Sequence, residues 1–402
     1  MTGPSTGPSI GPSIGPSTGP LAGLRVLDLT TTFSGPFCTL TLADLGAEVI
    51  KVEPPGGDIA RQLGACRTPG MAAVFLNMNR GKKSVVLDLK TPGDRAAFDR
   101  LVPTADVLVH NMRPAAAARL AVTYEDIRAT QPAIVYCAIP GYRSTSRHAD
   151  RPAYDDVIQG ASGIARLQSV NQEQPGYVTT PLADKIAGLT ASTAILAALR
   201  HRDATGEGQR VEVPMFETMV AFGLLEQLDG WTFDPPIGPP LYPRTAAPNR
   251  RPYATADGHL CVLIYTERQW LRFLTLVGRA DLLEHPDYDT VGKRITNADG
   301  LYQVVAEVLR ARTTADWLAE LAAIDVPCAP LAGYEEILRD EELAESGFVS
   351  IVEHPVAGRL RGIASPITMS ASPLPSPVGR HAPTLGEHGD EVLADVDTDD
   401  AR

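Results

Sequence analysis

Short apolar runs alternate with segments of helical periodicity through the first half of the chain. The runs at 24–29 and 47–53 predict buried strands, and the segment 37–45 between them predicts a helix. Two strands joined through a helix form a βαβ unit, in which the strands are parallel. The alternation continues through predicted strands at 84–89, 106–110, 133–138 and 210–213 and predicted helices at 92–101 and 124–130. This pattern predicts an α/β fold with a Rossmann-like, doubly wound parallel sheet.

The second half of the chain begins with a different pattern, a predicted helix at 216–231 followed by a stretch rich in proline and glycine. Residues 253–262 then predict a β-hairpin that turns at Asp257-Gly258. Further helices are predicted at 269–277, 298–310 and 314–323. We therefore expect a linker and a smaller α+β domain over 211–324, and a large domain made of 21–210 and 325–402.

The first twenty residues repeat Gly-Pro-Ser followed by Thr or Ile. Proline prevents regular strand pairing and glycine adds conformational entropy, so the tail 1–20 is predicted to be disordered. The period of the repeat also differs from the three-residue period of collagen.

The net charge limits the classes of partner that the protein is expected to bind. A formal net charge of −12 over 402 residues disfavours nucleic acid and anionic membranes as partners. No apolar segment reaches the roughly 20 residues that span a bilayer, and the N-terminus lacks a signal-peptide pattern. The five cysteines are scattered and contain no C-x-x-C pair, so we expect neither a zinc site nor disulfides, and a cytoplasmic location.

Common cofactor and enzyme motifs are missing. The turn after the first strand, residues 30–36, contains no Gly-x-Gly-x-x-Gly, which disfavours a dinucleotide site there. Walker A, His-Glu-x-x-His and Gly-x-Ser-x-Gly sequences are also absent. The sequence thus disfavours an NTPase, a zinc protease and an α/β-hydrolase.

A basic cluster, residues 79–83, precedes the predicted strand at 84–89. It is either a solvated turn or a site whose lysine and arginine side chains donate hydrogen bonds to phosphate oxygens. Arg113 and Arg119 follow the end of another predicted strand. Because ligands of open α/β sheets bind beyond the carboxyl ends of the strands, residues from several such loops could converge on one site.

Asp184 stands where a loop leads into an apolar run at 189–199. As a helix N-cap, its side chain would accept a hydrogen bond from a backbone N–H group of the first turn, worth about 1 kcal/mol. As a nucleophile, its carboxylate would be stabilised by the helix dipole, and nearby N–H groups would stabilise an oxyanion. The residue types alone leave both interpretations open.

Six short motifs follow one another along the chain, each at a single place. They are residues 21–28 (LAGLRVLD), 35–38 (GPFC), 42–53 (LADLGAEVIKVE), 79–84 (NRGKKS), 326–330 (VPCAP) and 385–388 (LGEH). In this order and spacing the sequence from 21 to 393 resembles the class III CoA-transferase family, which includes formyl-CoA transferase, carnitine CoA-transferase and α-methylacyl-CoA racemase.

The resemblance implies a catalytic role for Asp184 and makes the large domain the CoA-binding domain. It also implies contacts to CoA from Phe33, Ser34, Leu87, Asp88, Leu89, Lys90, Asn111, Met112, Arg113, Arg119, Gly141 and Tyr142. Pro54 stands where some members have an arginine, so no CoA contact is expected at that position. The family further implies an interlocked homodimer, CoA and acyl-CoA as substrates, no permanently bound cofactor and no metal.

The resemblance implies transfer of CoA from an acyl-CoA donor to a carboxylate acceptor, through anhydride and thioester intermediates on Asp184. Family racemases carry a histidine where this chain has Tyr154, and neutral tyrosine, with a pKa of about 10, is a poor base. A dicarboxylate acceptor would need a cation for its distal group, for which Arg147, His148 and Arg151 are candidates. An α-methylacyl-CoA racemase or acyl-CoA isomerase and a non-catalytic CoA-binding protein are the alternatives.

Overall fold

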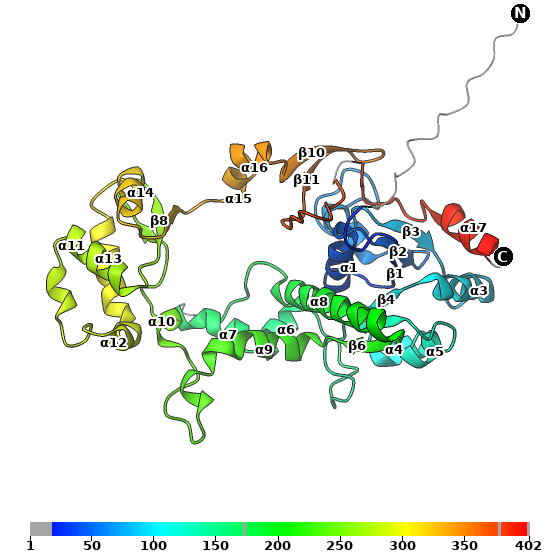
Figure 1. Cartoon of the computed structure of the whole chain (residues 1–402), viewed down its shortest axis with the longest axis horizontal. Helices are drawn as coiled ribbons and strands as arrows, with labels where there is room; N and C mark the ends of the chain where they lie inside the picture. The colour runs from blue at the N-terminus through cyan, green and yellow to red at the C-terminus, as the bar shows by residue number, and fades with distance from the viewer. Residues whose placement is uncertain (1–17, 172–173, 377–378, 400–402) are drawn as a thin grey trace, which may run out of the picture. The chain divides into compact units, whose positions relative to one another are not determined.

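The computed structural model describes residues 18–171, 174–376 and 379–399 (Figure 1). Most of the predicted disordered tail, 1–20, lies outside the described residues. The chain divides into two compact units, of which the first comprises Met1–Ser162, Thr179–Met219 and Glu342–Arg402 and the second comprises Gly163–Val178 and Val220–Glu341. The sequence predicted domain boundaries at 210 and 325, whereas the two units meet at 219 and 341 and exchange the segment 163–178. The predicted boundaries therefore stay a prediction.

The first unit is built on a six-stranded sheet with the order β3-β2-β1-β4-β5-β6, and each neighbouring pair is parallel. Its strands are β1 (Arg25–Asp28), β2 (Glu48–Glu53), β3 (Lys83–Val86), β4 (Val107–His110), β5 (Val135–Ala138) and β6 (Gln209–Glu212). This strand order is that of the doubly wound dinucleotide-binding folds. It confirms the predicted α/β class and the parallel sheet.

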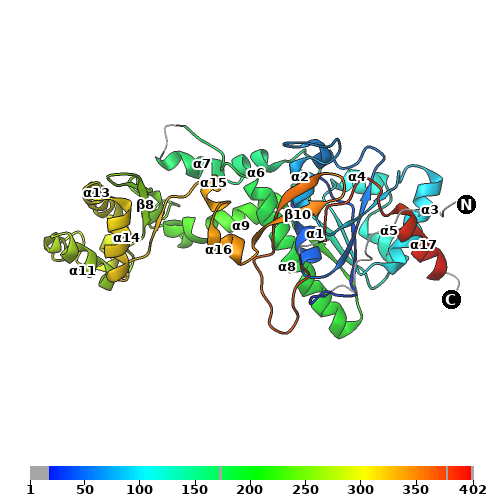
Figure 2. The ribbon, with the colours of Figure 1, turned by 90° about the horizontal axis from the view of Figure 1, so that it is seen from above.

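Helices cover both faces of this sheet. The helices of the first unit are α1 (Ser34–Asp44), α2 (Ala73–Met78), α3 (Pro92–Leu101), α4 (Pro114–Arg119), α5 (Tyr124–Arg128), α6 (Asp155–Ala161), α8 (Leu182–Thr205) and α17 (Gly389–Asp399). Figure 2 shows α1 and α8 on one side of the sheet and α3, α5 and α17 on the other. The crossovers therefore bury both faces, as a parallel sheet requires.

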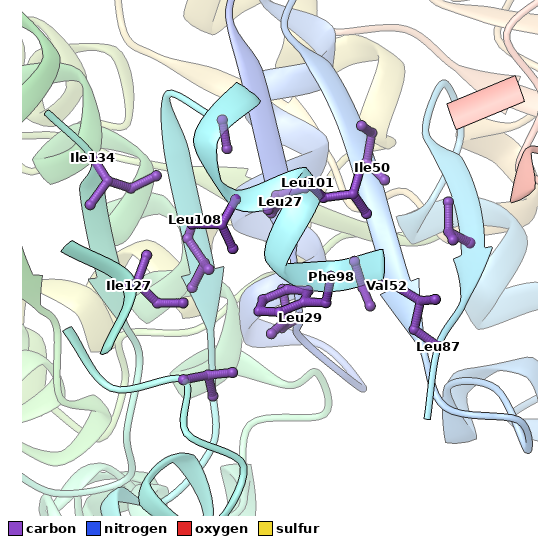
Figure 3. Packing of buried hydrophobic residues seen from close by; sticks show 14 of the residues in the cluster. Leu27, Leu29, Ile50, Val52, Leu87, Phe98, Leu101, Leu108, Ile127 and Ile134 are labelled. Carbon is purple, nitrogen blue, oxygen red and sulfur yellow. The ribbon is translucent and has the colours of Figure 1, made fainter. Parts of the chain in front are cut away.

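Strand β1 shows how alternation divides the interior. Leu27 and Leu29 belong to an apolar cluster with Phe98 and Leu101 of α3 (Figure 3). Asp28 points to the opposite face, where its carboxylate accepts a hydrogen bond of 2.6 Å from the Thr39 hydroxyl of α1. Successive side chains of a strand face opposite sides, so one face of β1 packs apolar groups while the other holds a buried charge.

The sequence predicts no apolar segment long enough to span a bilayer, and helix α8 corrects this expectation. By length and composition alone, its 24 residues are apolar enough to cross a membrane. Its buried side chains recur at helical spacing, at Ala183, Ala187, Ala191, Ile195 and Ala198. They pack α8 against α1, β5 and β6. A core helix of this kind passes the same test, so the finding is weak evidence for a membrane.

The end of the chain returns to the edge of the first unit's sheet. The hairpin of β10 (Val349–His354) and β11 (Gly358–Ile363) precedes it. The His388 N–H group donates to the Ser84 carbonyl at 3.0 Å, and the Gly386 N–H group donates to the Ser84 hydroxyl at 3.0 Å. Residues that are separated by about three hundred positions in the sequence thus complete the surroundings of β3.

The second unit has a core of its own around Trp270, Phe273 and Trp317. A three-stranded antiparallel sheet joins β7 (Tyr253–Ala254), β8 (His259–Val262) and β9 (Cys328–Pro330). Tyr253 pairs with Leu260, which confirms the predicted hairpin. Its helices are α7 (Ile164–Gln168), α10 (Pro243–Ala246), α11 (Glu267–Leu276), α12 (Val291–Thr296), α13 (Ala298–Leu309), α14 (Thr314–Ala323) and α15 (Tyr334–Ile337). Two further helices, α9 (Met215–Gln227) and α16 (Glu341–Glu345), cross the boundaries between the units.

Candidate active site

A cavity of about 520 Å³ lies at the carboxyl edge of the parallel sheet in the first unit. Residues that follow each of the six strands line it, namely Thr31, Pro54, Leu87, Asn111, Gly141 and Met215. The chain runs from β1 outward in both directions, so β1 and β4 form the switch point where ligands of such sheets bind. Asp184 also lines this cavity.

Asp184 is the third residue of α8, whose N-cap position is occupied by Pro181. The N-cap interpretation of Asp184 is therefore wrong, and its side chain is available for other contacts. Its backbone N–H group donates at 3.1 Å to Oδ1 of Asp155, the first residue of α6. A carboxylate from another helix thus satisfies a donor that the first turn of α8 leaves without an intrahelical partner.

The backbone N–H group and the hydroxyl of Ser34 act as donors towards the Asp184 carboxylate and lower its pKa. Ser34 is the first residue of α1, which begins three residues before the predicted start at 37. Pro36 allows this start, because the first turn of a helix needs no N–H donor there. The carboxylate therefore lies at the positive end of two helix dipoles, that of α1 and that of α8 itself.

Gly188 permits this approach of α1 to α8. A Cβ atom at Gly188 would lie 2.6 Å from the Ser34 carbonyl oxygen and 3.3 Å from the Cys38 nitrogen. Gly188 is one helical turn beyond Asp184, so this close contact between the two helices lies on the same face of α8 as Asp184. The missing side chain lets the Ser34 N–H group reach Asp184.

Burial, together with the neighbouring carboxylate of Asp155, raises the pKa of Asp184 to about 6, although donors on Ser34 act in the opposite direction. The side chain is therefore mostly ionised at neutral pH, yet it is more basic than an ordinary aspartate. A carboxylate with a raised pKa in a cavity is suited to nucleophilic attack on an acyl group.

The loop between β1 and α1 is held from three sides. The Lys51 ammonium donates to the Thr30 carbonyl at 2.7 Å. Asn111 accepts from the Thr31 N–H group at 3.1 Å, and Asp58 accepts from the Thr32 N–H group at 3.0 Å. Thr32 has a φ of 72°, a strained conformation that these contacts maintain. The loop fixes the position of Ser34, and hence the donors that face Asp184.

The basic cluster at 79–83 is neither a solvated turn nor a phosphate site. Lys82 is buried, and its ammonium lies 3.0 Å from Asp28 and 2.8 Å from both the Thr39 hydroxyl and the Asn79 amide oxygen. The other two cations are paired as well, Arg80 with Asp44 and Lys83 with Glu48 and Glu391. Sequence could not show that these charges face inward.

Ten of the predicted site residues line the cavity together. They are Ser34, Leu87, Asp88, Leu89, Lys90, Asn111, Met112, Arg113, Gly141 and Asp184. The other three predicted residues, Phe33, Arg119 and Tyr142, are not part of the cavity's described lining. Tyr142 is buried instead, and its ring packs against His148 and Phe216.

The lining contains residues that the sequence left uncertain or did not single out. Pro54, which stands where some members of the family have an arginine, lines the cavity. Of the three candidates for a distal carboxylate, Arg151 lines the cavity, whereas Arg147 and His148 do not occur in its described lining. Tyr154 also lines it and is 69% exposed. Asp155 was missed, because an acid at the start of a helix is ordinarily a surface residue.

Metal ligands do not gather anywhere in the described part of the chain: no group of three or more His, Cys, Asp or Glu side chains there could hold a metal ion. The polar groups of the cavity are instead carboxylates, an amide, hydroxyls and the cations Lys90, Arg113 and Arg151. Such cations are suited to bind phosphate and carboxylate groups.

Comparison with known proteins supports this description. The family model described as CoA-transferase family III matches residues 21–389. The chain is 33% identical to succinate--glutarate CoA-transferase of Agrobacterium fabrum, covering 94% of this chain and 96% of that protein. It is 34% identical to succinyl-CoA:mesaconate CoA-transferase of Haloarcula hispanica, covering 93% and 95%.

Solved structures agree with the sequence comparisons. A CAIB/BAIF family protein from Brucella suis superimposes with a TM-score of 0.78 at 30% identity, covering 94% of this chain and 100% of that one. The chain belongs to CoA-transferase family III and is a CoA-transferase.

Proposed function

We propose that this enzyme moves CoA between dicarboxylic acids and that Asp184 is its nucleophile. One observation carries the proposal: an aspartate with a raised pKa lies in the cavity at the carboxyl edge of the sheet, against the N-terminus of α1. The family membership supplies the reaction class. The position of Asp184 in the cavity supports its proposed role as the attacking group.

In the proposed mechanism, a carboxylate oxygen of Asp184 attacks the carbonyl carbon of the donor acyl-CoA. The carbon–sulfur bond breaks, CoA leaves as a thiolate, and Asp184 carries a mixed anhydride. The thiolate attacks the aspartyl carbonyl, which releases the donor acid and forms an aspartyl-CoA thioester. The acceptor carboxylate then attacks this thioester, which releases the CoA thiolate and forms a second anhydride between Asp184 and the acceptor. The thiolate finally attacks the acceptor's carbonyl carbon in this anhydride, which releases Asp184 as a carboxylate and forms the new acyl-CoA. Covalent catalysis of this kind divides a difficult exchange into feasible steps.

The site favours the oxyanions that these steps generate. Each attack places negative charge on a carbonyl oxygen near the first turns of α1 and α8, where backbone N–H groups and helix dipoles stabilise it. Lys90 and Arg113, which follow β3 and β4, are suited to bind the phosphate groups of CoA. The acyl end of the molecule would then point towards Asp184.

A dicarboxylate acceptor is supported by the relatives and by one arginine. The names of both reported relatives contain dicarboxylates, namely succinate, glutarate, succinyl-CoA and mesaconate. Arg151 lines the cavity next to the segment that leads through Tyr154 to α6. We propose that its guanidinium binds the distal carboxylate. Replacing Arg151 by Gln should raise KM for dicarboxylates about tenfold or more and leave monocarboxylates little affected.

The decisive test is replacement of Asp184 by Ala. We expect transfer between succinyl-CoA and glutarate or mesaconate to fall about 10⁴-fold or more, because no other carboxylate takes the nucleophile's place. Hydroxylamine trapping of the wild-type enzyme with acyl-CoA, followed by mass spectrometry, should modify Asp184. Asp156→Ala, at an exposed neighbour of Asp155, is the matched control. Near-wild-type turnover by the Asp184→Ala variant would rule out the mechanism.

Two further expectations belong to this proposal. We propose a homodimer, for which the exposed apolar residues Leu189 of α8 and Phe222 and Leu225 of α9 provide support. Light scattering coupled to size-exclusion chromatography would measure the mass in solution. A cytoplasmic location is supported by Cys66, Cys261 and the other three cysteines, all of which are free thiols.

A further inference from the structure

Asp155 is held so firmly that it cannot itself be the nucleophile. It is 9% exposed, and both of its carboxylate oxygens are already bonded. Oδ1 accepts from the Asp184 N–H group at 3.1 Å, and Oδ2 accepts from the Gln159 amide at 2.5 Å. Gln159 is fully buried, and its amide lies 3.4 Å from the Thr180 carbonyl oxygen just before α8. The start of α6 is thereby fastened to the start of α8.

The two carboxylates, Asp155 and Asp184, form a negatively charged pair, of which Asp184 lines the cavity. Within the described residues no ion pair joins either one to a cation. Lys185, the nearest cation in sequence, donates to the Thr180 hydroxyl at 2.7 Å instead. The hydrogen bonds that Asp184 receives come from neutral donors of Ser34. The charged or titratable groups that line the cavity around the pair are Asp88, Lys90, Arg113, Arg151 and Tyr154.

We infer that Asp155 is a positioning residue whose negative charge promotes acylation of Asp184, because acylation removes one of two neighbouring charges. This inference rests on the proposed nucleophilic role of Asp184. The ionised pair repels in the free enzyme. When an Asp184 oxygen bonds to the acyl carbon and the carbon–sulfur bond breaks, the charge departs with the CoA thiolate. Asp184 is then neutral, and the repulsion is gone.

The same arrangement explains why the repulsion persists in the folded protein. The hydrogen bonds from Gln159 and from the Asp184 backbone hold the Asp155 carboxylate in place beside Asp184, and its charge raises the pKa of Asp184. An unacylated Asp184 is therefore raised in energy relative to its anhydride and thioester. Interactions that weaken between the ground state and the acyl enzyme favour the forward step.

The test is a charge comparison at one position. Asp155→Asn keeps an oxygen that can accept from the Asp184 N–H group but removes the charge, and Gln159 can turn its amide to pair with the new side chain. We expect the acid limb of kcat/KM to move down by about one pH unit, because a negative neighbour no longer raises the pKa of Asp184. We also expect kcat to fall about tenfold and the trapped aspartyl-CoA fraction to decrease. Asp156→Asn is the control and should leave the pH profile unchanged.

A second pair of variants keeps the inference testable if Asp155→Asn folds poorly. Asp155→Gln and Asp155→Glu have similar volumes and differ in charge, so only the glutamate variant should retain the wild-type acid limb. An unchanged acid limb and unchanged trapped fraction in the neutral variants would overturn the role of Asp155. If Asp184→Ala remains active, the nucleophile itself is wrong. The two failures are therefore distinguishable.

Discussion

Two carboxylates near helix α1, the buried Asp28 and the partly buried Asp184, have opposite surroundings. Asp28 accepts from the hydroxyls of Thr30 and Thr39 and pairs with Lys82 at 3.0 Å. Its pKa is held well below the ordinary value by Lys51, Lys82 and these hydroxyls, despite the opposing effect of burial. The pKa of Asp184 is raised to about 6 by burial and by Asp155.

The difference separates a structural charge from a reactive one. The first turn of α1 provides donors to Asp184 through Ser34, and its second turn provides Thr39 to Asp28. Where cations neutralise the buried charge, the carboxylate has no tendency to react and ties α1 to the sheet. Where the causes acting on the pKa of a carboxylate are burial, a second acid and neutral donors, as at Asp184, the pKa is raised, which is the state that our proposal requires of a nucleophile.

The largest stability effect should come from neutral replacement of Lys82. Lys82→Met would leave Asp28 without its direct ion pair and would orphan the Asn79 oxygen, at an expected cost of about 3 to 5 kcal/mol in the free energy of unfolding. Urea unfolding followed by circular dichroism measures this. Lys83→Met is the control, since Lys83 is only partly buried and should cost about 1 kcal/mol or less. Equal costs at the two positions would contradict the distinction.

The next effect concerns the contact between α1 and α8. Gly188→Ala would bring its Cβ within 2.6 Å of the Ser34 carbonyl, so the first turn of α1 must move. We expect kcat to fall about 10- to 100-fold, because the donors to Asp184 are displaced. Steady-state kinetics on a variant with an intact circular dichroism spectrum measures this. Gly93→Ala, at an open position in α3, should retain full activity.

The smallest effect is a gain in stability. The folded state raises the pKa of Asp184 from 3.8 to about 6, so the free energy of unfolding falls as the pH rises between these two values and stays lowered above them. Below the ordinary value of 3.8 the penalty is absent. Asp184→Asn should therefore stabilise the enzyme by about 1 kcal/mol at neutral pH, after allowance for solvent screening, while abolishing transfer. Thermal unfolding at about pH 7.5 and about pH 4 checks the sign, since the gain should vanish in acid. If the Asp184→Asn variant were less stable than the wild type at neutral pH, ionisation of Asp184 would not weaken the folded state.

Much of the fold could be predicted because its strands and helices follow local patterns. The range 92–101 predicted for α3 and the range 314–323 predicted for α14 agree with the structure at both ends. The start of α1 was placed three residues too late, because Pro36 suggested a loop although it is permitted in the first turn. Because of that error, the sequence did not predict that Ser34 is the first residue of α1, where its N–H group is a donor towards Asp184.

The surroundings of Asp184 were harder to predict than its place in the cavity. The contact between Asp155 and Asp184 joins two helices, and no local pattern indicates which side chains meet there. An acid within an apolar strand was a signal for Asp28, since a charge at such a position needs an internal partner. Its partner Lys82, however, is separated from it by 54 positions in the sequence, and only the fold brings the two together.

The return of the C-terminal segment to Ser84 has a consequence for how this protein matures during synthesis. The first unit cannot close the edge of its sheet at β3 until residues 386 to 388 have emerged, after every residue of the second unit. The second unit, with its own core, can fold while the first still presents an unfinished edge. Truncation of the last few dozen residues would thus damage the unit that was translated first.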